Sequence, residues 1–388
     1  MKSYQNSPIN ILQIIDKFSM DTNSMHGATR LISYIHLSNK KYNLVTCCLR
    51  APDDAGRRLE QLGMRIIYHE KWKYNLLSIF YLIKIIYREH IDLLHLHGYR
   101  SWTFGRFLKA LTGIPALIPC HAKDPYYPRI QQVSDLFLAR FTDLAIAVSD
   151  SAKHFLTDHC RLPSDKIVVL NNCVSLTEFH PPTIQQIAEA RGRLGVKSGV
   201  KVIGTVTRLY EQKGNTHLLM AAAQVLKVFN DVVFVIVGDG PLLEDLRRLS
   251  RQLEIEQHVK FLGFYQKVPA ILAAFDIATQ ASLWEGTPLT ILEAMAMAKP
   301  IVATAVDGIA GILSDGENAL LVRPRDPNDL AQKLIYLLQH PTELQRLGRS
   351  AARDSHKYAS TEYVTRLDEL YQTILENSPR KFARSWPP

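Results

Sequence analysis

The chain has 388 residues, 47% of them hydrophobic and 21% charged, so it can build two sizeable cores and is not a disordered protein. Its net charge is +9, and residues 1–180 hold 22 Lys and Arg against 15 Asp and Glu, a net charge of +7. Nucleic acid, an anionic membrane or an anionic substrate each suits a basic half, but no nucleic-acid-binding motif accompanies it, so we expect no nucleic-acid partner.

The N-terminal half alternates short apolar strands with amphipathic helices. Strands are predicted at 9–15, 44–48 and 91–97, and a helix is predicted to begin at Gly27. This alternation predicts βαβ units and a parallel sheet. The five cysteines are odd in number and form no Cys-x-x-Cys pair, which favours buried free thiols over disulfides or a zinc site.

A segment of basic, aromatic and aliphatic residues, 71–88, belongs to the same half. Its apolar run, 75–87, is interrupted by Lys84 and is too short to cross a bilayer. The segment suits either a helix resting on an anionic membrane or a half-buried helix packed on the sheet, and the second interpretation is favoured. Because no apolar signal stretch opens the chain, we expect a cytoplasmic protein, with the inner face of the membrane as the alternative location.

Two histidines lie two residues apart on the third of these strands. His95 and His97 therefore face the same side of the sheet. Such a pair can ligate a metal ion, but no third ligand suggests itself, and no metal site is predicted.

The alternation stops at a polar, proline-containing stretch, 171–183, and then restarts, with later strands predicted at 232–237, 277–280 and 301–304. We therefore expect two Rossmann-like, doubly wound α/β domains, with ligands bound where the carboxyl ends of the strands meet a cleft. The predicted parts are an N-terminal domain at 1–178, a linker and helix at 179–198, a C-terminal domain at 199–358, and a final helix at 359–388 that crosses back to the first domain.

Residues 284–296 are the most informative segment. Thr287 is a good N-cap and Pro288 suits the first helical position, so a helix is predicted to begin there. The backbone N–H groups at such a helix start attract phosphate. Glu285 and Glu293 would flank this anion site, and a carboxylate can accept protons from two sugar hydroxyls.

A second cationic segment, 204–214, follows a predicted strand. Arg208 and Lys213 stand five residues apart after the strand and before a helix, which suits a cradle for two phosphates. Gly238 and Gly240 end another strand. The dinucleotide pattern would need a further glycine at Leu243, so an NAD enzyme is not favoured.

These segments, in this order, resemble the group 1 (family-four) retaining glycosyltransferases of GT-B fold. The stretch from Glu285 to Glu293 looks like the family's Glu-x7-Glu motif, and the segment with Arg208 and Lys213 looks like its donor diphosphate loop. The resemblance implies a nucleotide-sugar donor as substrate, with UDP-sugar favoured, no cofactor and no metal. It makes the first domain the acceptor side and the second domain the nucleotide-sugar side.

The resemblance also implies roles for individual residues. His121 would face the transferred sugar, and Gly27 would approach the donor phosphates, although His26 replaces a family glycine beside it. We expect His121, Glu285, Arg208 and Lys213 to be catalytic. The residues expected to bind the donor are Gly27, Arg208, Lys213, Gly238, Gly240, Leu262, Glu285, Gly286, Thr287, Pro288, Leu289 and Glu293.

The expected function is transfer of a hexose-type sugar, with retention of configuration, to a glycan or lipid-linked acceptor in polysaccharide or glycolipid synthesis. An anionic membrane surface is a candidate partner of the basic N-terminal half. Two alternatives stay open: an epimerase or phosphorylase of the same two-domain fold, and a non-catalytic scaffold that binds sugar nucleotides.

Overall fold

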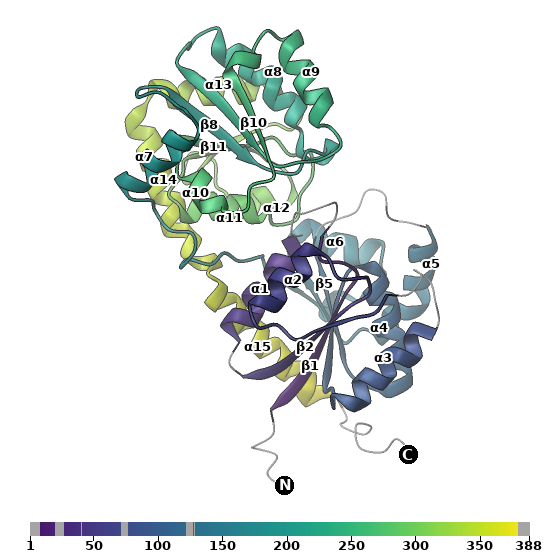
Figure 1. The fold of residues 1–388 in the computed structure, drawn as a ribbon. Coiled ribbons are helices and arrows are strands. Elements are labelled where there is room, and N and C mark those ends of the chain that lie inside the picture. Colours follow the sequence, from purple (N-terminus) through teal and green to yellow (C-terminus); the bar gives the residue numbers. More distant parts are fainter. Residues whose placement is uncertain are drawn as a thin grey trace. The chain divides into compact units, whose positions relative to one another are not determined.

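The structure is a computed structural model that describes residues 8–19, 27–39, 41–70, 77–121, 127 and 129–378. The chain divides into two compact units (Figure 1). The first comprises Met1–Asn171 with Ser360–Pro388, and the second comprises Asn172–Ala359.

The first unit is built on a seven-stranded parallel sheet of order β3-β2-β1-β4-β5-β6-β7. Its strands are β1 (Ile9–Ile15), β2 (Tyr42–Cys48), β3 (Ile66–Tyr68), β4 (Leu93–His97), β5 (Ala116–Cys120), β6 (Leu144–Ala147) and β7 (Ile167–Val169). Its helices are α1 (Gly27–Ser38), α2 (Asp54–Gln61), α3 (Leu77–Arg88), α4 (Tyr99–Thr112), α5 (Arg129–Leu138), α6 (Asp150–Asp158) and α15 (Ser360–Asn377).

Side chains that alternate along these strands supply two separate cores. Leu12 and Ile14 of β1 join the cluster that includes residues of α3, α4 and α6, while Ile15 joins the cluster of α1 and α2. This follows from the two-residue period of a strand. All five cysteines are free and buried, as predicted.

The second unit is built on a six-stranded parallel sheet of order β10-β9-β8-β11-β12-β13. Its strands are β8 (Lys201–Val206), β9 (Val232–Val237), β10 (Val259–Gly263), β11 (Ile277–Gln280), β12 (Ile301–Thr304) and β13 (Leu320–Val322). Its helices are α7 (Ile184–Arg193), α8 (Asn215–Leu226), α9 (Leu243–Gln252), α10 (Val268–Leu272), α11 (Leu289–Ala296), α12 (Asp307–Ala310), α13 (Pro327–Gln339) and α14 (Pro341–Ser355).

The boundary between the units differs from the predicted one. It lies after Asn171 rather than after residue 178, and the segment predicted as a linker and helix, 179–198, belongs to the second unit. The reason is burial: Phe179, Ala190 and Leu194 pack into the core of that unit.

The last helix, α15, belongs to the first unit although it follows the whole of the second in sequence. It contacts α1, and Tyr371 donates or accepts a hydrogen bond of 2.8 Å with Nδ1 of His95 on β4. In the described part of the chain, no helix combines the length and the apolar character that crossing a membrane requires.

Candidate functional site

Two loops meet at one edge of the second sheet. Because β8 and β11 are parallel neighbours, the chain leaves both strands at the same edge. A short 3-10 turn, Glu211–Lys213, ends at Gly214 with φ +60°, and a Cβ there would lie 2.0 Å from the backbone oxygen of Ala281. Only glycine therefore allows this backbone approach.

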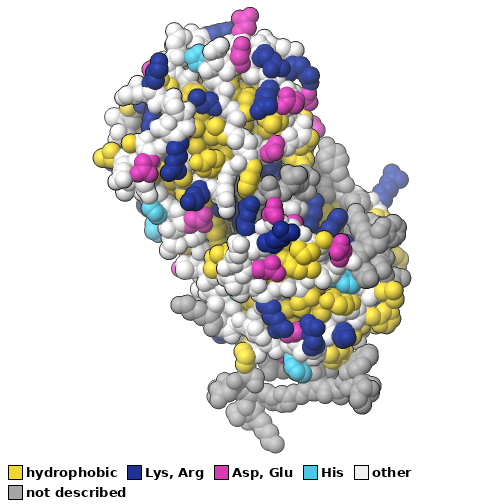
Figure 2. Space-filling view, in the orientation of Figure 1, with side chains coloured by type: hydrophobic (Ala, Val, Ile, Leu, Met, Phe, Trp, Pro, Cys, Tyr) yellow, Lys and Arg dark blue, Asp and Glu magenta, His cyan; other side chains and the backbone are white. Residues whose placement is uncertain are grey.

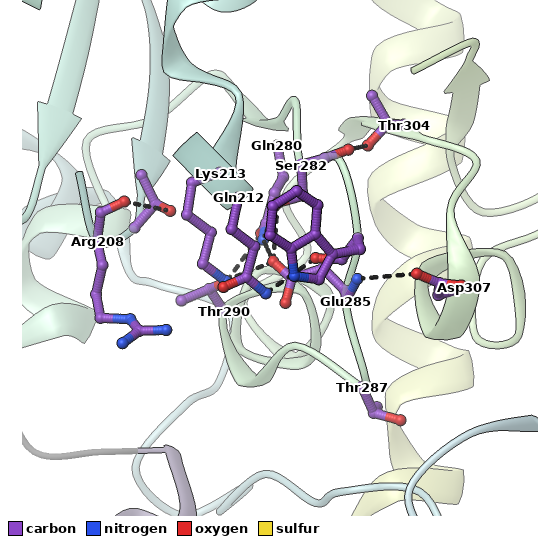
Figure 3. A network of polar contacts seen from close by, with 12 residues as sticks. Arg208, Gln212, Lys213, Gln280, Ser282, Glu285, Thr287, Thr290, Thr304 and Asp307 are labelled. Atoms are coloured by element: carbon purple, nitrogen blue, oxygen red, sulfur yellow. Dashed lines mark hydrogen bonds and ion pairs between the residues drawn. The ribbon is translucent and has the colours of Figure 1, made fainter. Parts of the chain in front are cut away.

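Hydrogen bonds join the two loops. The backbone N–H of Leu283 donates to the carbonyl of Gln212 at 2.7 Å. Nε2 of Gln212, which Figure 3 labels, donates to the carbonyl of Trp284 at 3.0 Å. The turn that carries Lys213 is thus fixed against the loop that carries Glu285.

An ion pair results from this arrangement. Nζ of Lys213 lies 2.5 Å from Oε1 of Glu285, and the two side chains are 12% and 6% exposed. The same carboxylate oxygen accepts hydrogen bonds of 2.8 Å from Nε2 of Gln280 and from Oγ of Ser282. Glu285 is therefore held by three donors in one orientation, which a buried carboxylate requires.

Helix α11 begins next to this pair, but one residue later than predicted. Its first residue is Leu289, and Pro288 is the N-cap with extended backbone (φ −71°, ψ 124°) and no side-chain cap. The predicted Thr287 cap is wrong because Pro288 is not yet helical. Instead, the Thr287 carbonyl accepts a 2.7 Å hydrogen bond from Nδ2 of Asn172.

The segment that leads into α11 is enclosed. Residues 285–289, which include Gly286, are all buried, and Glu293 is the fifth residue of α11 and 0% exposed. Thr290 connects the helix to the pair, since its Oγ1 donates to Oε1 of Gln280 at 2.9 Å. The structure thus brings the start of α11 and the Lys213–Glu285 pair into one polar network (Figure 3).

Arg208 stands apart from this network. Its guanidinium carbon lies 5.2 Å from the centroid of the Tyr210 ring, and no dashed line in Figure 3 joins the guanidinium to Lys213 or Glu285. The predicted phosphate ligand Arg208 is therefore not one of the partners of the Lys213–Glu285 pair.

The strand ends near Gly238, Gly240 and Leu262 form a second group at the sheet edge. Gly238 has φ +134°, and a Cβ would lie 1.8 Å from the backbone oxygen of Thr207, so close backbone packing alone requires glycine here. Its N–H donates to the carbonyl of Gly263 at 2.8 Å, which places β10, with Leu262, beside it.

In the first unit, histidines lie together at the carboxyl ends of β4 and β5. His121 follows β5, and its ring is stacked on that of His97, with centroids 5.8 Å apart and planes 11° apart. The ring centroid of His97 in turn lies 4.2 Å from that of His95. Burial lowers the pKa of His121 to about 4 and that of His95 to about 3, because an imidazolium loses its hydration there. The rings of His95 and His121 are consequently neutral at pH 7.

Gly27 is the exposed first residue of α1, and His26 lies outside the described residues. Among the residues that the structure describes, no three His, Cys, Asp or Glu side chains are grouped so that they could hold a metal ion.

Sequence reasoning missed Gln280, Ser282 and Tyr371. Gln280 ends a predicted strand at the ligand-binding edge, and this position is a usable signal. Nothing in the sequence indicates that Tyr371, on the last helix, reaches His95.

Comparisons with known proteins agree with this architecture. A family model described as "Glycosyltransferase Family 4" matches residues 34–178, and one described as "Glycosyl transferases group 1" matches residues 200–340. A curated relative, the Escherichia coli UDP-Gal:alpha-D-GlcNAc-diphosphoundecaprenol alpha-1,3-galactosyltransferase, is 27% identical over 66% of this chain and 69% of its own length. The alpha-monoglucosyldiacylglycerol synthase of Acholeplasma laidlawii is 23% identical over 75% of this chain and 77% of its own.

Solved structures share the fold. Anabaena HepE in complex with UDP and glucose superposes with a TM-score of 0.85 at 20% identity, covering 94% of this chain and 100% of that chain. Sucrose-phosphate synthase from Thermosynechococcus elongatus superposes with a TM-score of 0.79 at 17% identity, covering 95% and 100%. With two parallel-sheet domains, family models that match each of them and glycosyltransferase relatives across most of its length, the chain belongs to the group 1, family 4 glycosyltransferases of GT-B fold.

Proposed function

We propose that this glycosyltransferase transfers a hexose, with retention of configuration and without a metal ion, from a nucleotide-sugar donor to a glycan or lipid-linked acceptor. The observation that carries the proposal is the Lys213–Glu285 pair beside the buried start of α11. It combines a cation and a carboxylate, the two groups that a sugar diphosphate needs.

Lys213 is proposed to bind the donor diphosphate. An ammonium has three N–H donors, and the bond to Glu285 uses one of them. The N–H groups at the start of α11 add a partial positive charge. As the C1–O bond to phosphate breaks, Lys213, Arg208 and this helix start stabilise the charge that develops on the departing diphosphate.

The sugar and the base are assigned to the remaining residues. Glu285 and Glu293 would accept hydrogen bonds from hydroxyl groups, and the backbone at Gly286, Thr287, Pro288 and Leu289 would line the sugar diphosphate. Gly238, Gly240 and Leu262 would contact the nucleoside.

His121 and Gly27 belong to the other unit, so their approach to the donor remains a prediction. Because burial lowers the pKa of His121 to about 4, its neutral ring suits orientation of a sugar hydroxyl and not proton donation. We propose front-face displacement: the acceptor oxygen bonds to C1 on the face that the phosphate leaves, and the departing phosphate oxygen takes the hydroxyl proton.

The relatives support the choice of donor and acceptor. One uses UDP-Gal and a diphosphoundecaprenol-linked acceptor, another makes a glucosyldiacylglycerol, and HepE binds UDP and glucose. We therefore favour a UDP-sugar and a product in cell-surface polysaccharide or glycolipid synthesis. The location that suits such an acceptor is the cytoplasm, at the inner face of the membrane.

A donor screen tests the assignment. UDP-, GDP-, ADP- and CMP-sugars are added singly, and the rise in melting temperature is measured for the wild type, Lys213→Ala and Glu293→Ala. We expect one nucleotide class to stabilise the wild type and to stabilise the variants less. A screen in which no donor shifts the wild type would disprove the site.

Turnover is tested separately with the donor that binds. Nucleoside diphosphate released only when acceptor is present indicates a transferase, whereas conversion of donor without acceptor indicates an epimerase. Binding without turnover over a broad acceptor panel indicates a scaffold. An NMR spectrum showing an inverted anomeric centre in the product would rule out retention.

A further inference from the structure

Helix α5 in the first unit is amphipathic, but its polar side faces the protein and its apolar side faces outward, which is the reverse of the usual arrangement. Its inward side carries Asp135, whose carboxylate forms a fully buried ion pair with Arg106 of α4. Gln131 adds hydrogen bonds to Thr103 of α4 and to Asp135. Polar contacts therefore hold this helix on its neighbour.

The outward side of α5 is apolar. Ile130, Val133, Leu136 and Phe137 are 69%, 54%, 59% and 65% exposed. Three of them recur at i, i+3 and i+7, so they form one stripe along the helix. A surface helix normally faces the core with such a stripe, and here the stripe faces outward.

Neighbouring helices extend the apolar surface. Helix α4 contacts both α3 and α5, and the three lie along one side of the first unit in Figure 1. Leu77 and Phe80 of α3 are 67% and 70% exposed, and Phe107 and Leu111 of α4 are 40% and 62% exposed. Of the sixteen exposed large apolar side chains in the described residues, eight lie on these three helices.

We call this surface the α3–α5 face. In Figure 2, hydrophobic side chains reach the surface along the right-hand margin of the first unit, where Figure 1 shows α3 and α4.

The charge of the α3–α5 face has one sign. Lys84 on α3, Arg129 on α5 and Arg140 just after α5 are exposed. The three helices are completely described, and their single carboxylate is the buried Asp135. Exposed apolar groups are thus flanked by cations with no exposed anion among them.

From this combination we infer that the α3–α5 face docks on the surface of an anionic lipid bilayer. Apolar side chains enter the boundary between headgroups and acyl chains, and the flanking cations attract anionic headgroups. A second copy of the chain fits less well, because a symmetric interface would bring like charges together. The inference rests on the proposed function in one respect, since a bilayer would present a lipid-linked acceptor.

The α3–α5 face also changes the expectation for residues 71–88. Helix α3 packs on the sheet with Ser78, Leu82, Ile85 and Ile86 buried, as the favoured interpretation predicted. Its outer side nevertheless contributes Phe80 and Lys84 to the face. Lys71 and Lys73 lie outside the described residues.

Vesicle flotation of the full chain tests the inference, without donor or acceptor. The vesicles contain phosphatidylcholine alone or an equimolar mixture with phosphatidylglycerol. We expect binding to the mixture only, weakening as salt is raised. Ile130→Ser/Val133→Ser/Phe137→Ser should lower the partition coefficient about tenfold or more, and Arg129→Gln/Arg140→Gln should lower it for the anionic vesicles.

The matched control is Ile184→Ser/Val228→Ser, which makes the same kind of change at exposed apolar residues of the second unit. This control should bind as the wild type does. Equal binding by the triple variant, or a wild type that self-associates and does not float, would overturn the inference. Melting-temperature shifts with donor, measured on the same variants, are expected to match the wild type, so a failed donor site is recognised independently.

Discussion

At the scale of single residues, the contact between Lys213 and Glu285 is the feature on which the proposed chemistry depends. Both side chains are nearly buried, so each charge needs the other. We expect Lys213→Met to lower the free energy of unfolding by about 3 kcal/mol, because it leaves the Glu285 carboxylate with only neutral donors. Urea unfolding measures the change.

The double variant Lys213→Met/Glu285→Gln is the control for this prediction. The glutamine can still accept hydrogen bonds from Gln280 and Ser282 but carries no charge. The double variant should therefore have a free energy of unfolding at least about 1 kcal/mol higher than that of Lys213→Met alone. Simple additivity of the two single substitutions would show that the ion pair does not couple them.

A second prediction concerns the stacked histidines. The folded pKa values of His95 and His121, about 3 and about 4, lie below the unfolded value of 6.5, so the unfolded chain binds more protons between these values. Stability should therefore fall as pH is lowered from 6.5 towards 4, by up to about 1.4 kcal/mol per pH unit for each histidine. Urea midpoints measured across this range give the slope.

His97→Phe identifies the source of that slope. Burial also holds the pKa of His97 well below its usual value, so phenylalanine removes one titrating ring and keeps an aromatic group between its neighbours. We expect a shallower pH dependence in this variant. A slope identical to that of the wild type would assign the pH dependence to other groups.

The positions of individual site residues could be predicted from the sequence where a local pattern of strand, loop and helix indicates them. Lys213 and Glu285 follow strands and precede helices, and such positions can be read without a structure. The Thr287 cap was predicted wrongly because the backbone angle at Pro288 decides where α11 begins. The bonds from Gln280 and Ser282 depend on two loops meeting in space, which no local pattern reports.

At the scale of elements, the turn before α8 fixes the site. Gly214→Ala would place a methyl group against the Ala281 carbonyl at a positive φ, and the two loops would have to separate. We expect a loss of more than about 1 kcal/mol in stability and a weaker melting-temperature shift with the donor.

Gly192→Ala is the matched control. Gly192 lies in α7, and a Cβ there meets nothing within 4 Å. Alanine favours the helix by up to about 1 kcal/mol, so this variant should be as stable as the wild type or more so. If both alanine variants bind donor as the wild type does, the Gly214 turn does not position the site.

Helix α15 supports the first unit from the far end of the sequence. Leu367 is 1% exposed, so Leu367→Ala should cost about 3 kcal/mol of unfolding free energy. Thr373→Ala, at an exposed position of the same helix, should change it by less than about 0.5 kcal/mol. Equal effects in urea unfolding would mean that α15 does not stabilise this unit.

Most strands were predictable because a buried parallel strand is a continuous apolar run. Those at 9–15, 232–237, 277–280 and 301–304 have the predicted bounds. The reversed polarity of α5 was not recognised, because its apolar stripe looks like an inward face and only the Arg106–Asp135 pair shows which side is buried.

At the scale of the whole molecule, the alternation of strands and helices predicted two doubly wound domains, and both sheets are parallel throughout. The exact boundary between the two units could not be predicted from the sequence. Residues 172–183 are polar and contain prolines, like a linker, yet Val174 and Phe179 are buried in the second unit. Composition does not reveal a short segment that is anchored by a few apolar side chains.

The last prediction follows from the unit to which each proposed donor-binding residue belongs. Lys213, Arg208 and the start of α11 all belong to the second unit, so the nucleotide diphosphate should bind there without the first. We expect UDP alone, if UDP is the donor nucleotide, to slow hydrogen exchange in 208–214 and 281–289 and to leave α15 unchanged. UDP-sugar should add protection near His121, because the sugar is proposed to approach that residue. If UDP protects only the first unit, the donor is assigned to the wrong unit. If both ligands protect the second unit and UDP-sugar adds no protection near His121, then His121 does not belong to the proposed site, whereas Lys213 and Glu285 stay in it.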